Sequence, residues 1–139
     1  MEKVTRFGVS IDSNLLDKFD ALIRKMGYGS RSEAFRDLIR EKLVAEEWKA
    51  QNKEAVGVVT LVYSHDIRDL TETLNRIQHQ HLTAIVSSTH IHLDHHNCLE
   101  VVVLRGKGKD IKKIADELLA TRSVKHGKLI ATTTGKDIE

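Results

Sequence analysis

Residues 90–101 read His-Ile-His-Leu-Asp-His-His-Asn-Cys-Leu-Glu-Val, two alternating segments separated by a polar break. The break, residues 94–97, has the composition of a hairpin turn. Side chains alternate across a strand, so pairing His92 with Cys98 sends every second residue to the same face of the sheet. The stretch therefore predicts a β-hairpin whose register is set by its own hydrophobic pattern.

This register separates polar from apolar side chains. One face carries His90, His92, Cys98 and Glu100. The other face is apolar and is predicted to be the core face, with the polar face left without helices and covered by another subunit. The residues of the predicted core face are Ile91, Leu93, Leu99, Val101 and Val103.

The polar face has the chemistry of a transition-metal site. Six of the eight histidines and the single cysteine fall between His79 and Cys98. Imidazole nitrogen and thiolate sulfur suit nickel, copper or zinc and suit calcium or magnesium poorly. Glu100 is placed to accept a hydrogen bond from the free ring nitrogen of a ligating histidine. The alternative is a polar sheet face that is rich in histidine by chance.

The flanking sequence predicts the rest of a βαββαβ domain. Strands are expected at 56–65, 82–93, 98–104 and 124–133, with amphipathic helices from Ile67 toward His79 and over 111–119. This order is typical of a ferredoxin-like sheet with both helices on one face. The fold class is therefore α+β.

The first fifty residues form a separate pattern of one strand and two helices. Phe7, Val9 and Ile11 alternate with polar residues, and a helix capped by Asp12 or Ser13 follows and ends at Gly27. Residues 30–33, Ser-Arg-Ser-Glu, are a capping box that opens the second helix. A lone strand has two unpaired edges, so we expect a dimer in which the two strands pair.

A two-stranded ribbon fits the major groove of DNA. Its polar face would present Arg6, Gly8 and Ser10, with Arg6 able to read guanine. The start of the second helix, with Ser30, Arg31 and Ser32, offers backbone N–H groups and a cation to phosphate. The alternative is a solvated strand face.

Two resemblances follow. The stretch Gly27-Tyr28-x-x-Arg31-Ser32-Glu33-Ala34 is similar to ribbon-helix-helix DNA-binding domains. The whole chain, with His79, His90-x-His92 and Cys98 at these spacings, resembles the nickel-responsive regulators of the NikR family, which join such a domain to an ACT-like metal-sensing domain. The expected boundaries are 1–48 for the DNA-binding domain, 49–54 for a linker and 55–139 for the sensing domain.

The resemblance implies a repressor of nickel-uptake genes that is active when Ni(II) is bound, one ion per subunit. It implies a square-planar site in which His90, His92 and Cys98 of one subunit are joined by His79 of its neighbour in a homotetramer, a dimer of dimers. It also implies that Glu33 and Asp37 can bind a second cation, and that Arg68 can touch the DNA backbone. Gly8 lacks the hydroxyl found in some relatives, so their operator sequence does not transfer.

Composition limits the remaining possibilities. There is no apolar run near 18 residues and no signal peptide at Met1, and one cysteine excludes an internal disulfide, so a cytoplasmic protein without a membrane span is expected. An enzyme is not expected, because four protein ligands leave no open position on the metal. The competing functions are an antitoxin, and a regulator whose ACT-like domain senses an amino acid or another transition metal. Of the other histidines, His81 is a candidate for an alternative site, whereas His65, His95, His96 and His126 have no assigned role.

Overall fold

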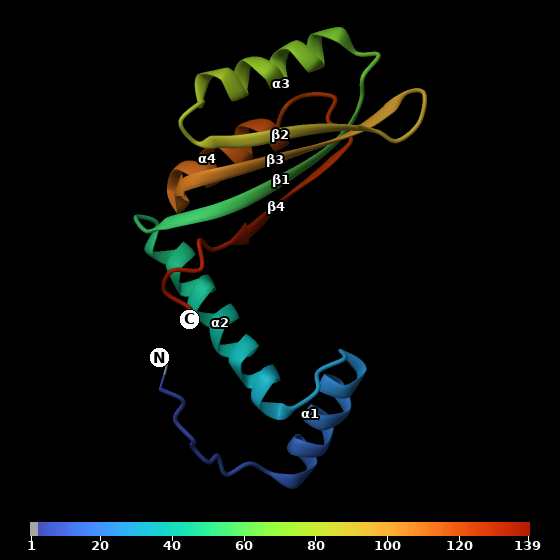
Figure 1. Cartoon of the computed structure of the whole chain (residues 1–139). Coiled ribbons are helices and arrows are strands. Elements are labelled where there is room, and N and C mark those ends of the chain that lie inside the picture. Colours follow the sequence, from blue (N-terminus) through green and yellow to red (C-terminus); the bar gives the residue numbers. More distant parts are fainter. Residues whose placement is uncertain (1–2) are drawn as a thin grey trace. The chain divides into compact units, whose positions relative to one another are not determined.

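A computed structural model describes residues 3–139 and divides the chain into two compact units. One ends at Glu41 and the other spans Lys42–Glu139 (Figure 1). Helix α2, Arg31–Ala50, begins in the first unit and ends in the second. The predicted boundaries at 48 and 54 remain a prediction, but α2 runs through Ala50 and strand β1 starts at Glu54, so only residues 51–53 lie outside regular structure.

The first unit forms its helices as the local sequence predicts. Helix α1, Ser13–Lys25, starts at Asp12, whose carboxylate accepts the backbone N–H groups of Asn14 and Leu15. It ends before Gly27, which has a positive φ of 87° that a side chain would disfavour. Ser30 Oγ accepts the N–H of Glu33 at 3.2 Å, so the predicted capping box is half formed, and the Glu33 carboxylate turns to Gly29 N–H instead of Ser30 N–H.

The predicted strand at 6–11 is not formed in this single chain. Residues 6–11 have no strand partner, and Phe7 and Val9 are 71% and 58% exposed. The physical reason is that a strand exists only through its hydrogen-bonded neighbour, and no segment within residues 3–139 supplies that neighbour. Pairing with the same strand of a second copy would cover the exposed apolar side chains of this segment, Phe7 and Val9 among them.

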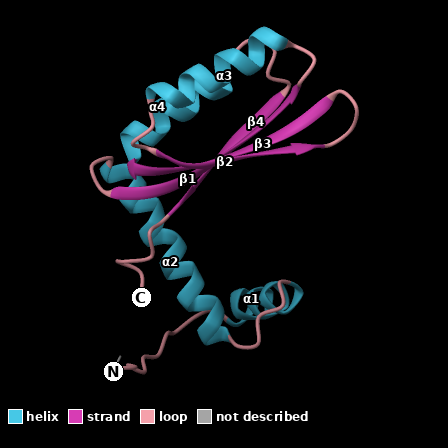
Figure 2. Ribbon diagram, turned by 45° about the horizontal axis from the view of Figure 1, so that its top comes forward, coloured by secondary structure: helices cyan, strands magenta, loops and turns pink. Residues whose placement is uncertain are grey.

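The second unit is a four-stranded antiparallel sheet with two helices. Its elements are β1 (Glu54–Ser64), α3 (Arg68–Gln80), β2 (Ile85–His92), β3 (Asn97–Lys107), α4 (Gly108–Leu119) and β4 (His126–Thr132). The strand order is β2-β3-β1-β4, so β2 and β4 are the edges. Figure 2 shows α3 and α4 on the same side of the sheet. The predicted βαββαβ order and the α+β class are confirmed.

The hairpin register is confirmed, but the assignment of its faces was wrong. His92 pairs with Cys98 and His90 with Glu100, as predicted. Cys98, Glu100 and Val102 nevertheless point to the helix-covered side, where they are at most 2% exposed and pack with the residues of α3 and α4. The apolar set expected in the core lies on the opposite face, where Ile91 is 43% exposed.

The error has a physical cause. The sequence favours the uniformly apolar face of the hairpin as the core face, because burying a carboxylate such as that of Glu100 normally costs free energy. In the fold, three donors converge on this carboxylate and offset its desolvation. The core around it consists of buried side chains of the two central strands and the two helices: Val59, Leu61, Tyr63, Val102, Leu104, Leu70, Leu74, Ile111, Ile114 and Leu118.

Candidate metal centre

The predicted donors come from three elements of the second unit. His90 and His92 stand on the edge strand β2, and Cys98 stands opposite His92 at the start of β3. His79 is exposed near the end of α3. Because β2 is an edge strand, one side of this group lies open to another chain.

Within one chain these donors do not converge. In the described part of the chain, no three histidine, cysteine or acidic side chains are gathered closely enough to hold a metal ion. His90 is instead turned to Glu100, with its Nε2 3.3 Å from Oε1. A complete centre therefore requires His90 and His92 to turn, or a further donor to enter, or both.

Glu100 is the best-fixed side chain near these donors. It is fully buried, and its carboxylate accepts Tyr63 OH at 2.8 Å, Gln78 Nε2 at 2.7 Å and Ser88 Oγ at 2.8 Å. Tyr63 OH also lies 3.3 Å from His90 Nδ1. Both ring nitrogens of His90 thus lie 3.3 Å from a member of this network, which also ties α3, through Gln78, to the central strands.

Tyr63, Gln78 and Ser88 are not predicted as site residues from the sequence. One of them carried a readable signal, because Gln78 follows Leu70 and Leu74 at four-residue steps and so occupies the buried stripe of α3. A polar residue at a buried helical position usually has a partner in the core. Burial, followed by the hydrogen bond to Glu100, raises the pKa of Tyr63 well above its usual value, so its hydroxyl acts as a donor at neutral pH.

Cys98 is protonated when no metal is bound. Burial raises the pKa of its thiol, and the nearby Glu100 adds to this, while contact with Tyr63 acts in the opposite direction. Its Sγ donates to Tyr63 O at 3.5 Å. A metal ion binding here must displace this proton, which makes binding weaker in acid.

Three of the remaining histidines, His65, His81 and His96, lie against other side chains. The rings of His65 and His92 meet edge to face with centroids 5.2 Å apart, and His65 Nδ1 is buried with no hydrogen-bond partner among residues 3–139. His96 Nδ1 lies 2.7 Å from Asp66 Oδ2, and His81 Nε2 lies 3.3 Å from Glu117 Oε2. His95 and His126 are exposed.

The candidate DNA-binding residues lie on the first unit. Arg6, Gly8 and Ser10 are exposed. Arg31 is held by a bidentate ion pair with Asp20, with N···O distances of 2.8 and 2.7 Å, so a phosphate would have to share or replace Asp20. Ser30 caps α2.

The proposed second cation pair is engaged within the first unit. Glu33 accepts Gly29 N–H at 3.1 Å, and Asp37 accepts Tyr28 OH at 2.9 Å. Asp37 also lies 3.5 Å from the Arg40 guanidinium, so a cation would have to share these carboxylates with their present partners.

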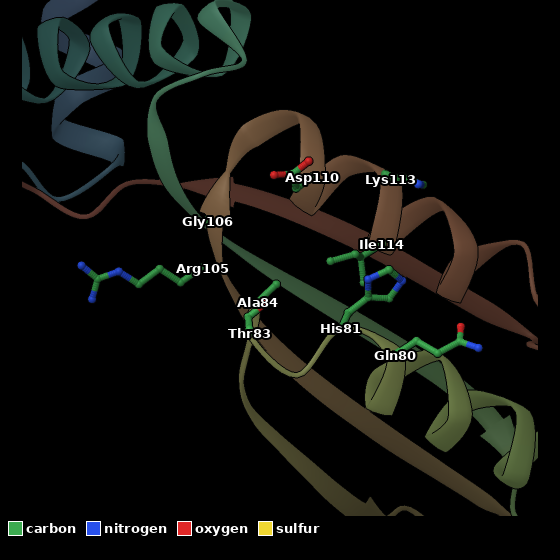
Figure 3. Close-up of a pocket in the computed structure, with 9 residues that line it drawn as sticks. All are labelled: Gln80, His81, Thr83, Ala84, Arg105, Gly106, Asp110, Lys113 and Ile114. Carbon is green, nitrogen blue, oxygen red and sulfur yellow. The ribbon is translucent and has the colours of Figure 1, made fainter.

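A cavity of about 310 Å³ opens between the end of α3, the end of β3 and α4 (Figure 3). An amino acid would require convergent charges there. Asp110 and Lys113 lie along α4, but the Arg105 side chain points away from the other labelled residues and is held by Glu54 at 2.7 Å. The cavity wall thus keeps one acidic and one basic side chain, Asp110 and Lys113. No helix within residues 3–139 is long and apolar enough to cross a bilayer.

Comparison with known proteins defines the family. Residues 56–132 match the NikR C-terminal nickel-binding domain, and residues 5–46 match the ribbon-helix-helix proteins of the copG family. Proteins described as "Putative nickel-responsive regulator" are 56% identical in Pyrococcus furiosus, over 97% of this chain and 98% of the relative, and 51% identical in Caldanaerobacter subterraneus, over 99% and 90%. The relative in Geobacter metallireducens is 56% identical over 99% of both chains.

One solved structure shares the fold. An uncharacterized protein of Thermotoga maritima aligns with a TM-score of 0.51 and 15% identity, over 57% of this chain and 98% of that one.

The two family matches together cover both units, with a ribbon-helix-helix DNA-binding domain and a nickel-binding C-terminal domain. The chain belongs to the NikR family of nickel-responsive, DNA-binding transcriptional regulators, which are not enzymes.

Proposed function

We propose that this regulator represses nickel-uptake genes when each subunit binds one Ni(II) ion through His90, His92 and Cys98 and through His79 of a neighbouring subunit. The observation that carries the proposal is the strand register, in which His92 is opposite Cys98 and His90 is two residues along the same face. Two imidazoles and a thiolate are a donor set for nickel, copper or zinc.

One chain supplies only part of the donor set, which supports a metal site shared between two subunits. The described residues hold no complete group of three donors, and β2 is an edge strand with its outer side unpaired. His79 is exposed near the end of α3 and has no partner of its own in the described chain. A neighbouring subunit paired along β2 would bring such a donor to the open side of the centre.

The open face of the sheet supports a larger assembly. Its apolar side chains are partly or largely solvent exposed in the single chain, which is unusual for a sheet face of this size. These residues are Val58, Val62, Ile91, Leu99, Val101, Val103 and Ile130. Together with the β2 edge and the N-terminal strand at 6–11, this face gives each subunit enough separate surfaces to build a dimer of dimers.

The regulation is a linkage between metal and DNA. Metal that joins His79 of one subunit to another subunit's strands braces the assembly in one arrangement. The DNA-binding domains then bind an operator more tightly only if they fit both of its halves in that arrangement. Bound DNA must tighten nickel binding by the same factor as nickel tightens DNA binding.

The first experiment is an absorption titration of the metal-free protein with Ni(II). We expect ligand-field and thiolate charge-transfer bands of square-planar nickel that saturate at one ion per chain. Cys98→Ala should abolish the charge-transfer band, whereas His95→Ala, in the exposed hairpin loop, should leave it unchanged. An octahedral spectrum that Cys98→Ala does not alter would refute the site.

The second experiment tests whether Ni(II) changes the affinity of the protein for DNA. Duplexes are selected from a randomised pool by the nickel-loaded protein and their affinity is then measured with and without Ni(II) at fixed salt. Tighter binding with nickel is expected. An affinity that ignores nickel but responds to an added amino acid would favour the amino-acid-sensing alternative.

A further inference from the structure

The first unit, Met1–Glu41, carries little net charge for a DNA-binding unit. Its sequence contains eight lysine or arginine side chains and seven aspartate or glutamate side chains, a net charge of +1. Lysine and arginine side chains that neutralise phosphates supply most of the affinity for DNA of any sequence. The affinity of this unit for DNA therefore depends on which of its cations can reach a phosphate and which are held by an acid of the same unit.

Arg31 is the cation at the position where the sequence predicts contact with a DNA phosphate. It is the first residue of α2, where the backbone N–H groups of a helix suit an anion. Its guanidinium donates two parallel bonds to Asp20 of α1, from Nε to Oδ1 at 2.8 Å and from Nη2 to Oδ2 at 2.7 Å. Arginine binds a phosphate through the same two-pronged geometry, so Asp20 occupies the edge of the guanidinium that a phosphate would use.

The ion pair of Arg31 and Asp20 persists at neutral pH and is open to solvent. The hydrogen bonds from Arg31 lower the pKa of Asp20, and the same bonds raise the pKa of Arg31, so both groups stay charged. The side chains of Arg31 and Asp20 are 54% and 26% exposed. A phosphate can therefore approach the guanidinium, but it meets the carboxylate beside it.

We propose that Asp20 weakens the binding of the metal-free protein to DNA of any sequence by occupying the guanidinium of Arg31. A phosphate that reaches Arg31 has to displace the carboxylate or lie next to its negative charge, and both reduce the affinity. A phosphate contact does not read sequence, so the effect is the same on an operator and on other DNA. Asp20 thus limits how much DNA the protein binds before any metal acts. The inference does not rest on the nickel-dependent repression proposed above.

The test is the affinity of the metal-free full chain for a duplex of random sequence, measured by fluorescence anisotropy between about 50 and 200 mM salt. Asp20→Asn keeps the shape of the side chain and removes its charge. We expect roughly tenfold tighter binding at the lowest salt, and a slope of log affinity against log salt that is steeper by about 0.9 for each Arg31 that gains a phosphate. An unchanged affinity and slope would overturn the proposal.

Two controls separate the ion pair from a general change in charge. Asp17→Asn removes the same charge three residues earlier on α1, from a side chain that acts on Arg31 through its charge alone. It should tighten binding far less than Asp20→Asn does. In a double-mutant cycle, Arg31→Gln should reduce the gain from Asp20→Asn to the level of Asp17→Asn. An equal gain from the two aspartate variants, or a gain that persists in Arg31→Gln, would show that Asp20 does not act through Arg31.

A variant that conserves charge keeps the test decisive if Asp20→Asn loses helix in far-ultraviolet circular dichroism. Arg31→Lys leaves the net charge unchanged but replaces the planar guanidinium by an ammonium group, which cannot donate two parallel bonds to Asp20. The looser pair should release the cation to DNA, so a smaller rise in affinity and in salt slope is expected. An affinity equal to or below that of the wild type would contradict the proposal.

Discussion

Replacing Glu100 with leucine removes the acceptor on which the interior of the sensing domain converges. Tyr63 and Gln78, 1% and 9% exposed, would each lose the bond to this carboxylate, while Ser88 can turn to solvent. A buried donor left without an acceptor costs about 1–3 kcal/mol, so two donors cost about 2–6 kcal/mol. Tyr63 OH can turn to His90 Nδ1, 3.3 Å away. The free energy of unfolding is therefore expected to fall by about 2–4 kcal/mol.

The assay is denaturant unfolding of the metal-free protein at one fixed protein concentration, followed by circular dichroism. Glu54→Leu is the matched control. Glu54 is a carboxylate with two cationic partners, but it is exposed, so water can hydrate these cations when the carboxylate is removed. Glu100→Gln keeps the shape and one acceptor oxygen and should recover much of the loss. A Glu100→Leu protein as stable as wild type would show that desolvation of the carboxylate cancels its three bonds, and the reasoning would be refuted.

Four further outcomes follow from particular residues. Leu74→Ala, at a fully buried position, should lower the free energy of unfolding by about 2–5 kcal/mol in the same assay, whereas Leu82→Ala, 65% exposed, should change it little. Donation from the side chain and backbone of Asn97 lowers the pKa of Asp94 to about 2, so its stabilising effect is complete above the unfolded pKa of about 3.9 and is lost as pH falls toward 2; the stability difference from Asp94→Asn should shrink over that window in acid titrations. Val101→Asp on the open sheet face should dissociate the assembly in sedimentation velocity while Lys109→Glu on α4 should not, and an unchanged sedimentation coefficient for Val101→Asp would exclude this face as an interface. Gly27→Ala, at a positive φ of 87°, should lower the melting temperature, whereas Gly8→Ala, with no positive φ and open space around it, should not.

Local sequence patterns determined the hairpin register, the ends of α1 and the order of the secondary-structure elements. The alternation around residues 94–97 predicts the hairpin and pairs His92 with Cys98, because a slip by one residue would exchange every side chain between the two faces. Asp12 and Gly27 predict the ends of α1, since capping depends on residues adjacent in sequence. The element order then follows from helical and strand periodicity.

Only the tertiary structure decided which face of the hairpin is covered. Strand β3 carries apolar side chains on both faces, Val102 and Leu104 on one and Leu99, Val101 and Val103 on the other, so the choice depends on where α3 and α4 pack, a contact between residues far apart in sequence. Burial of Glu100 became possible because Gln78, Tyr63 and Ser88 arrive from three other elements. The contacts of Trp48 depend in the same way on Thr132, Gly57 and Gly108, which no local pattern brings together. Periodicity is a property of neighbouring residues, whereas the satisfaction of a buried polar group is a property of the whole fold.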